Sequence, residues 1–487
     1  MGKRFKLIGI KWLGAGLALA LAWLSMGIWQ SAKPLPDGIG KAWPERKVTD
    51  VRFLTDRTWY DTRGKRHMDQ HIFDEALAMI REARRLIVMD MFLFNSLEGQ
   101  DAPVDLRPIA EELSAALIEA KQRHPDMQVV VITDPLNTVY GGVRLKHLEH
   151  MRAVGVDVVI TDLNRLRASN PLYSGLYHLG LDRLGNDPDG GWLPNAFGGD
   201  PVTLRSYLAL PNFRANHRKT LVTDDGQQWV ALVGSANPHD GSSRHGNVAL
   251  RVEGEMAHDL VASEAVLASW AGVELSMPSA PALRTSEANV STAATVQLLT
   301  EGAIRDASLE MINAADRGDR LDLAAFYISH RKVIEALKDA VARGVKVRAL
   351  LDRNREAFGF DKGGLPNQPV AAELVQAGIK VRWCLTSGEQ CHSKVLRLHS
   401  TTSSDEVILG SANLTRRNLD NLNLETSVLL KGDADLSAMR DQADWFNERW
   451  ASSPDHRTSR PWKPEHDPGR LAAWRYRVME ATGLSTF

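Results

Sequence analysis

The sequence predicts an α/β protein made of two homologous halves, each a mixed β-sheet flanked by helices. Segments with helical periodicity alternate with short β-rich runs, the order of these elements occurs twice along the chain, and one polar pattern recurs at the matching place of each copy. The composition agrees with a globular fold, since 44% of the 487 residues are hydrophobic and 24% are charged.

The N-terminal segment is predicted to be a membrane anchor. An uncharged apolar run extends from Trp12 to Trp29, which is long enough to cross a bilayer as a helix. Four basic residues precede this run: Lys3, Arg4, Lys6 and Lys11. They predict that this end stays in the cytoplasm and that the rest of the chain is exported. We therefore assign residues 1–34 to a membrane helix and the start of a spacer, and favour a retained anchor over a cleaved signal peptide.

The first copy of the α/β pattern occupies residues 35–270. Its predicted elements are a helix at 71–84, a strand at 86–94, a helix at 109–121, a strand at 129–132, a helix at 145–153 and a strand at 156–160. An extra stretch at 165–210 is rich in Gly, Pro, Tyr and Trp. Long inserts of this kind usually lie over a site or on the surface.

The second copy occupies residues 301–450. Its predicted elements are a helix at 304–315, a strand at 321–328, a helix at 332–343, a strand at 345–351, a helix at 370–377 and a strand at 379–383. Two local similarities support a duplication, because Ile132-Thr133-Asp134 resembles Leu350-Leu351-Asp352 and Val154-Gly155-Val156 resembles Ala377-Gly378-Ile379. The two pairs have nearly the same offset, as an internal repeat requires.

Two further segments lie outside the repeat. Residues 276–295 are rich in Ser, Ala, Pro and Thr and lack apolar periodicity, so a linker is predicted at 271–300. Residues 451–487 form a C-terminal tail with several Trp and Arg residues. We expect the tail to dock against the body, with contact to a membrane surface as the alternative.

Each half carries an H-x-K pattern followed by G-S-x-N. The residues of the first half are His217, Lys219, Asp224, Ser235 and Asn237, and those of the second half are His392, Lys394, Ser411 and Asn413. The distance along the chain from the histidine to the G-S-x-N group differs by one residue between the halves. One such pattern arises by chance, but two at matching places of a repeat indicate a site.

These residue types suit a phosphate group. Positions i and i+2 of a strand point to the same face, so the histidine and lysine of each pattern share one side. The lysine is a point charge for phosphate oxygens, and the imidazole can attack phosphorus or exchange a proton near neutral pH. Glycine permits close approach of the backbone, while serine and asparagine donate hydrogen bonds. Two halves placed face to face would surround one phosphate with the histidine, lysine, serine and asparagine side chains of both patterns.

The duplicated H-x-K-x4-D and G-S-x-N pattern resembles the signature of the phospholipase D superfamily. The string from Pro211 to Lys219 is similar to the cardiolipin synthase branch. The resemblance covers most of residues 70–450. It implies two phospholipase D-like halves packed with pseudo-two-fold symmetry, and a ping-pong reaction on a phospholipid by hydrolysis or phosphatidyl transfer. It also implies a phosphohistidine intermediate and a site that needs no metal or other cofactor. We expect His217 to be the nucleophile and His392 the general acid/base, with the reverse order open.

The second pattern departs from this family, because His399 stands where the family has an aspartate. If that aspartate chiefly orients the pattern, Asp405 or Glu406 can replace it and activity is retained, which we favour. If it is required, the protein is a degenerate, non-catalytic binder of phosphate or lipid. Asn423-Leu424-Glu425 resembles the family's Asn-x-Glu, so Glu425 is a candidate to orient an imidazole. The first half has Asn247-Val248-Ala249 there and lacks the acid.

The charge and cysteine content narrow the functional classes. With 59 Lys and Arg against 60 Asp and Glu, the net charge is -1, which counts against a nuclease or a stable nucleic acid partner. The two cysteines, Cys384 and Cys391, are too few for a common zinc site and form either a disulfide or two free thiols. We expect a phospholipid substrate, and the sequence does not indicate an oligomeric state.

Overall fold

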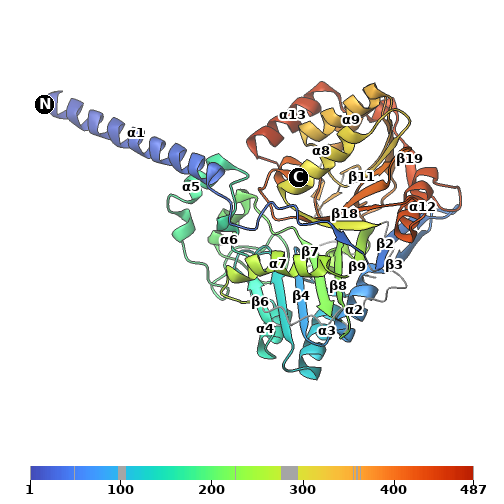
Figure 1. The fold of residues 1–487 in the computed structure, drawn as a ribbon. Helices are drawn as coiled ribbons and strands as arrows, with labels where there is room; N and C mark the ends of the chain where they lie inside the picture. Colours follow the sequence, from blue (N-terminus) through green and yellow to red (C-terminus); the bar gives the residue numbers. More distant parts are fainter. Residues whose placement is uncertain are drawn as a thin grey trace.

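Two mixed β-sheets face each other in the computed structural model, and helices cover the outer face of each (Figure 1). The structure describes residues 2–48, 50–96, 106–224, 226–275, 294–354, 356–357, 360–361, 363–485 and 487. Apolar side chains from both sheets form one shared core between them. The predicted α/β architecture of two homologous halves is confirmed.

The first sheet has the strand order β3-β2-β9-β8-β7-β4-β5-β6. Its strands are β2 (Asp50–Tyr60), β3 (Arg66–Gln70), β4 (Leu86–Met91), β5 (Gln128–Thr133), β6 (Asp157–Ile160), β7 (Lys219–Asp224), β8 (Trp229–Gly234) and β9 (Asn247–Glu253). Strands β4, β5 and β6 are parallel, and the others pair antiparallel. Three helices, α2 (Ile72–Glu82), α3 (Ile109–Arg123) and α4 (Lys146–Ala153), pack their apolar faces on it.

The second sheet repeats this arrangement in the order β1-β10-β18-β17-β16-β11-β12-β15-β19. Its strands are β1 (Arg46–Lys47), β10 (Thr295–Thr300), β11 (Arg320–Ala325), β12 (Lys346–Leu351), β15 (Lys380–Cys384), β16 (Lys394–His399), β17 (Asp405–Gly410), β18 (Thr426–Gly432) and β19 (Ser459–Pro461). From β10 to β15 it matches the first sheet from β2 to β6, strand by strand. A separate small hairpin is formed by β13 (Glu356–Ala357) and β14 (Phe360–Asp361).

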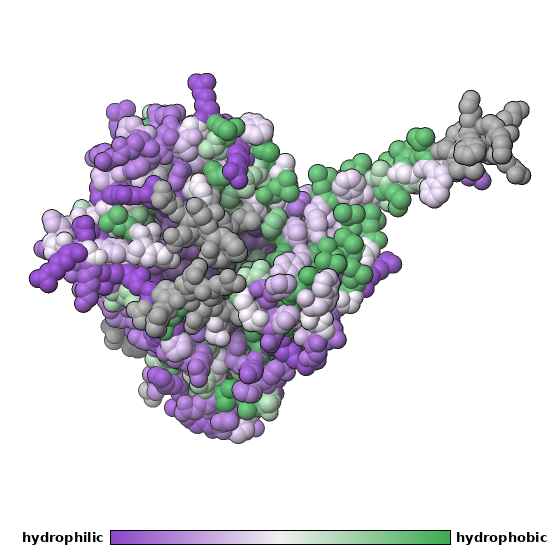
Figure 2. Space-filling model, turned by 180° about the vertical axis from the view of Figure 1, so that it is seen from behind, coloured by the Kyte–Doolittle hydropathy of each residue, from purple (hydrophilic) through white to green (hydrophobic). Residues whose placement is uncertain are grey.

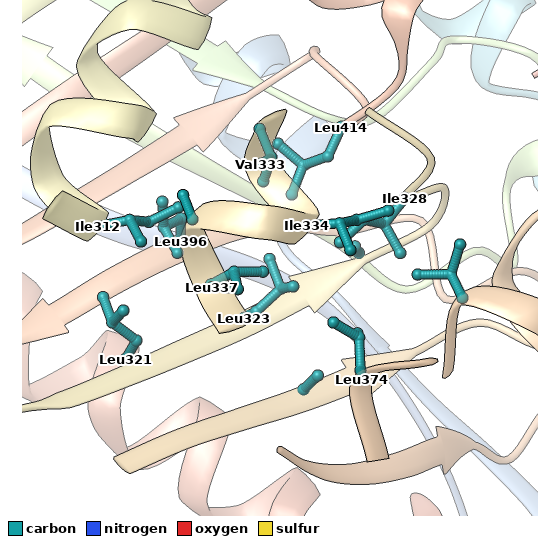
Figure 3. Close-up of a cluster of buried hydrophobic side chains, with 14 of the residues drawn as sticks. Ile312, Leu321, Leu323, Ile328, Val333, Ile334, Leu337, Leu374, Leu396 and Leu414 are labelled. Carbon is teal, nitrogen blue, oxygen red and sulfur yellow. The ribbon is translucent and has the colours of Figure 1, made fainter. Parts of the chain in front are cut away.

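The outer core of the second half shows why its predicted helices form. Helices α8 (Gly302–Ala314), α9 (Arg331–Arg343) and α10 (Asn367–Gln376) bury one face each against the sheet. Figure 3 shows Leu337 of α9 beside Leu323 of β11, and Ile334 of α9 beside Ile328, and all four are buried. At about 1.5–3 kcal/mol per buried Leu or Ile side chain, such packing outweighs intrinsic helix propensity.

Each half of the protein ends in a further helix. These helices are α7 (Met256–Ser269) and α12 (Ser437–Ala451), and both contribute to the core shared by the two sheets. A short helix, α11 (Arg416–Leu419), follows β17. The C-terminal helix α13 (Gly469–Thr482) docks on the second half through the buried Tyr476.

The long helix α1 (Gly2–Ala32) projects from the body (Figure 1). Its segment Lys11–Ala32 is the one stretch of the described chain that is long and apolar enough to cross a membrane, with a mean hydropathy of 1.5 and only 6% of its most apolar window buried. Beyond it, the spacer runs along the second sheet, where β1 pairs antiparallel with β10. Trp43 N also donates to Leu298 O at 2.9 Å.

Two predicted boundaries differ from the structure. The spacer, assigned to the first half at 35–270, instead adds the edge strand β1 to the second sheet, beside β10. The linker predicted at 271–300 ends earlier, since Thr295–Thr300 forms β10, and its residues 276–293 lie outside the described residues. The tail at 451–487 docks against the body as expected, because β19 pairs with β15 and α13 packs on the core.

The insert at 165–210 lies where α1 meets the body (Figure 1). It contains α5 (Pro171–Tyr177), the 3-10 turn η2 (Leu181–Arg183) and α6 (Leu204–Ala209), and leads into the turn η3 (Leu210–Asn212). Helix α5 packs directly on α1, where a Cβ atom added to Gly175 would lie 2.7 Å from Trp23 O. The insert therefore joins the apolar helix to the segment that precedes His217.

Candidate active site

His217 stands just before β7 and is held by the second half of the protein. Its backbone N–H donates to Leu424 O at 2.9 Å, and its Nδ1 lies 3.0 Å from a carboxylate oxygen of Glu425. The ring also contacts Phe92, with 4.8 Å between the centroids. Because Nδ1 faces a carboxylate, it carries the proton, and Nε2 has the free lone pair.

His392 stands just before β16 and is held by the first half in the same way. Its backbone N–H donates to Gly246 O at 2.8 Å. Its Nδ1 lies 2.9 Å from Ser235 O and 3.1 Å from Asn247 Oδ1, while Phe326 takes the place of Phe92 beside the ring. Both neighbours of Nδ1 are acceptors, so Nδ1 is again the donor and Nε2 is free.

The reciprocal contacts show that Asn247 is the structural counterpart of Glu425. Each residue accepts a hydrogen bond from the serine of its own G-S-x-N group, Asn247 from Ser235 at 3.0 Å and Glu425 from Ser411. The alignment of Asn247 with Asn423 in the sequence is therefore wrong by two residues. The segment from Ser235 to Asn247 is two residues shorter than the segment from Ser411 to Glu425, so the sequence alone does not align Asn247 with Glu425.

The two lysines occupy equivalent places. Lys219 Nζ donates to His217 O at 2.7 Å, and Lys394 Nζ donates to His392 O at 2.6 Å. Both are buried. Each ammonium group can still donate two further hydrogen bonds, since an ammonium has three protons.

The G-S-x-N groups place two more amides at this site. Asn237 and Asn413 are each only 6% exposed, and the Oδ1 atom of each has no hydrogen-bond partner among the described residues. Such buried unpaired polar atoms are uncommon in a folded protein. The serines Ser235 and Ser411, by contrast, hold Asn247 and Glu425 and so act within the framework.

Burial and like charges shift the pKa of every ionisable group here. The pKa of His217 is lowered to about 4, chiefly by burial, with Lys219 and Lys394 also lowering it and Glu425 opposing the change. Burial also lowers the pKa of His392 well below its ordinary value, with contributions from Lys394, Lys219 and His217. Since each histidine is affected by the lysine of the other half, the two patterns share one site.

Lys219 and Glu425 complete this electrostatic picture. Burial lowers the pKa of Lys219 to about 7 although Glu425 raises it, and the pKa of Lys394 falls well below its usual value for the same reason. Burial opposes ionisation of Glu425, but His217 and Lys219 lower its pKa below the ordinary value. One carboxylate thus lies among basic groups whose protonated forms are destabilised, and a bound anion would raise the pKa of these groups.

Two buried aspartates hold the backbone just before each histidine. Asp134 accepts from Asn216 N at 2.7 Å, and Asp352 accepts from Cys391 N at 2.8 Å. These are the residues of the repeated Ile132-Thr133-Asp134 and Leu350-Leu351-Asp352 strings. The repetition that identified the duplication therefore also marks two positioning residues.

Asp224 and His399 lie away from the imidazoles, at the far ends of β7 and β16. At about 3.3 Å per residue, the length of the strand separates Asp224 from His217. Asp224 accepts from the N–H groups of Arg85 at 2.8 Å and Leu86 at 3.1 Å. It therefore fastens the start of β4 and is a framework residue, so its inclusion among the catalytic residues is not supported by its position.

At the equivalent end of the second half, His399 Nδ1 lies 3.0 Å from Asp405. Asp405 also accepts from Arg397. Of the two acids that could replace the family's aspartate, Asp405 and not Glu406 thus holds this end of the strand. The departure at His399 therefore lies at the end of β16, away from His217 and His392.

Sequence reasoning missed a buried ion cluster behind the first pattern. Arg218, fully buried between His217 and Lys219 in the chain, donates to Glu301 at 2.8 Å and to Glu264 at 3.3 Å. Glu301 also accepts from Glu425 N at 3.0 Å. No motif marks these glutamates, because their partners come from distant parts of the chain. Breaking such a buried pair typically costs about 3–5 kcal/mol.

A disulfide joins Cys384 to Cys391, which settles the question that the sequence left open. Cys391 directly precedes His392, so the disulfide ties the end of β15 to the second pattern. Among the residues that the structure describes, no group of three His, Cys, Asp or Glu side chains could hold a metal ion.

Residues 309–450 match the family model described as cardiolipin synthase, PLD-like domain. No curated protein sequence matches the chain. Among solved structures, phosphatidylserine synthase from Haemophilus influenzae is similar, with 11% identity and a TM-score of 0.51, and the alignment covers 90% of this chain and 97% of that one. That likeness extends the shared fold to both halves.

Two other solved structures are similar at lower scores. Polyphosphate kinase from Porphyromonas gingivalis shows 14% identity and a TM-score of 0.46. The alignment covers 89% of this chain and 53% of the kinase, so this chain spans about half of that protein's length. The phospholipase D family member Nuc from Salmonella typhimurium shows 22% identity and a TM-score of 0.27 over 34% of this chain and 99% of its own.

Proposed function

We propose that this chain is a member of the phospholipase D superfamily, which the match of residues 309–450 and the shared fold support, and that it cleaves the phosphodiester of a phospholipid, transferring the phosphatidyl group to water or to an alcohol. The observation that carries this proposal is the reciprocal support of the two imidazoles. His217 is held by Glu425 of the second half, and His392 by Ser235 and Asn247 of the first. The two Nε2 atoms can then act on the same phosphodiester group.

In the first step, Nε2 of His217 attacks phosphorus and a phosphohistidine forms. The bond from phosphorus to the leaving alcohol breaks. The bound anionic phosphate raises the pKa of His392, which is then protonated at both nitrogens and donates its Nε2 proton to that oxygen. The negative charge of Glu425 stabilises the cationic phosphorylated ring of His217. His392 has only a neutral amide beside Nδ1, so it holds its proton weakly, which suits an acid.

In the second step, His392 takes a proton from water or from an acceptor alcohol. The oxygen attacks phosphorus, the bond to Nε2 of His217 breaks, and both imidazoles return to their starting state. Lys219, Lys394 and the amides of Asn237 and Asn413 bind the phosphate oxygens in both steps, which keeps the developing charge compensated.

We further propose that α1 is a retained anchor and that the catalytic body is extracytoplasmic. The apolar segment Lys11–Ala32 supports this, as do the basic residues that precede it. An anchored enzyme meets lipid substrate at a high effective concentration. The net charge of -1 remains an argument against nucleic acid as the substrate.

The test is a product analysis with the full-length protein in vesicles. Labelled phosphatidylglycerol is supplied with and without ethanol as the acceptor alcohol, and DNA is supplied in a parallel reaction. We expect phosphatidic acid or a transphosphatidylation product, and no DNA cleavage. His217→Ala and His392→Ala should each abolish turnover, whereas the exposed His150→Ala should not. Lipid turnover that survives both substitutions would exclude the proposal.

A covalent intermediate separates the roles of the two histidines. In His392→Ala, the second step lacks its base, so acid-labile phosphate should accumulate on His217. Label on residue 392 in the His217→Ala protein would instead assign the reverse order.

A further inference from the structure

Large apolar side chains are exposed on the insert as well as on α1. The six in the insert are Leu172, Leu176, Leu179, Leu184, Trp192 and Leu204. The body of a soluble protein seldom exposes so many in one short segment. Figure 2 shows apolar surface continuing from α1 onto the part of the body at its base.

Helix α5 of the insert contacts α1 within its apolar segment, Lys11–Ala32. Trp23 Nε1 donates to Leu172 O at 2.7 Å, and a Cβ added to Gly175 would lie 2.9 Å from Gly27 N. Glycines that let two backbones approach so closely are typical of helix pairs within membranes. At 1.5 Å per residue, Gly27 lies about 8 Å along the helix from Ala32, where the apolar segment ends.

The side of α5 that faces away from the body is apolar. Leu172 and Leu176 are one helical turn apart and are 58% and 48% exposed, and Leu179 follows a further turn on. The charges of the insert balance, with four Arg and four Asp between 165 and 210. A surface of this kind suits the hydrocarbon of a lipid leaflet better than its charged headgroups.

We propose that α5 and the turn that follows it, as far as Leu179, insert into the extracytoplasmic leaflet beside α1. This inference rests on the proposed function, because it requires α1 to span the membrane. The catalytic body is then fixed to the bilayer at two points, a transmembrane helix and an embedded segment packed against it. Two points of attachment prevent rotation of the body about α1.

The embedded segment is fastened to the chain that carries His217. Ser174 Oγ donates to Asn212 Oδ1 at 2.8 Å, and Asn170 Nδ2 donates to Pro211 O at 3.2 Å. Both acceptors lie in η3, a few residues before His217. The depth of α5 in the leaflet therefore fixes the height of the active site above the lipid phosphates.

The test measures depth with single labels on the full-length protein in vesicles of neutral phosphatidylcholine. A new cysteine is placed at Leu176, at Leu17 of α1 as a marker of spanning, and at the exposed Met68 of β3 as an aqueous control. Each carries an environment-sensitive fluorophore. We expect lipids brominated on their acyl chains to quench the labels at 176 and 17 but not at 68, with no change when salt is raised.

The outcomes separate the two proposals. Quenching at 17 without quenching at 176 overturns the embedded segment and leaves anchoring intact. If neither position is quenched, anchoring fails and the inference falls with it. Quenching at 176 in a protein without lipid turnover would support the embedded segment while excluding the proposed reaction.

An activity measurement gives a second readout. In the double variant Leu172→Asn and Leu176→Asn, both exposed residues become polar, so folding is unaffected while insertion is weakened. We expect turnover of vesicle lipid to fall about tenfold and turnover of a soluble short-chain lipid to stay unchanged. Met68→Asn should change neither. An equal rate on vesicles in the double variant would contradict the inference.

Discussion

Nδ1 of His217 lies 3.0 Å from the carboxylate of Glu425, although the two residues belong to opposite halves of the protein. In the equivalent place, Nδ1 of His392 lies 3.1 Å from the amide oxygen of Asn247. The duplicated fold thus supplies a full negative charge to one imidazole and a neutral dipole to the other. This difference makes the two histidines chemically unequal.

Glu425→Gln should lower kcat about 100- to 1000-fold, because the phosphorylated ring of His217 loses its counter-charge. Glu425 also raises the pKa of His217, so its removal should move the acidic limb of the pH profile to lower pH. Lipid turnover across pH measures both effects. The control is Glu406→Gln on β17, and an unchanged kcat for Glu425→Gln would contradict the nucleophilic role of His217.

Asn247→Asp should give His392 a carboxylate partner and raise its pKa. The imidazolium of His392 is then a weaker acid, so release of the leaving alcohol in the first step slows, whereas its neutral form is a stronger base for the second step. We expect the single-turnover rate of phosphohistidine formation to fall, as rapid mixing can resolve, without accumulation of the intermediate. Asn447→Asp adds the same charge on the exposed side of α12 and should leave this rate unchanged. Accumulation of phosphohistidine in Asn247→Asp would contradict the role of His392 as the acid of the first step.

The ratio kcat/KM should rise as pH increases through about 4, since burial lowers the pKa of His217 to about 4 and its neutral form attacks. It should fall as pH increases through about 7, where Lys219 loses its charge. A dispersed short-chain lipid gives the profile without changes in the bilayer. Lys219→Arg keeps the charge, so its alkaline limb should move to higher pH. An acidic limb centred near 6.5 would contradict the burial of His217.

Asp224→Asn should reduce stability by about 1–3 kcal/mol and leave kcat nearly unchanged, because Asp224 binds the backbone of β4 and not the substrate. Burial raises the pKa of Asp224, but hydrogen bonds from Arg85 and Leu86 lower it below the ordinary value. The contribution of Asp224 to the free energy of unfolding is therefore complete above the ordinary pKa of an aspartate, and it is lost as pH falls through the lowered pKa. Denaturant unfolding at several pH values measures this, and a large loss of kcat in folded protein would return Asp224 to the catalytic residues.

Much of the architecture could be predicted because it follows from local patterns. The helix predicted at 332–343 is α9 (Arg331–Arg343), and the strand predicted at 345–351 is β12 (Lys346–Leu351). Amphipathic spacing and β-rich runs are local patterns that indicate such elements in the sequence. The duplication then placed His217 and His392 in equivalent positions.

Other features depend on contacts between distant segments. No local pattern pairs Arg218 with Glu301, or assigns the spacer to the second sheet. The role of Asn247 was missed because the halves differ in length between the serine and this residue. Asp224 was counted as catalytic because a motif records which residues occur together and not where their side chains point.

The pairing of β1 with β10 has a practical consequence for any form of the protein that lacks α1. A chain that starts at Asp50 would remove α1 but also strip the outermost strand from the second sheet, and the bare backbone of β10 would then be free to pair with another molecule. A chain that starts at Pro34 would keep that edge covered. Aggregation of the shorter form should not be mistaken for a need for lipid.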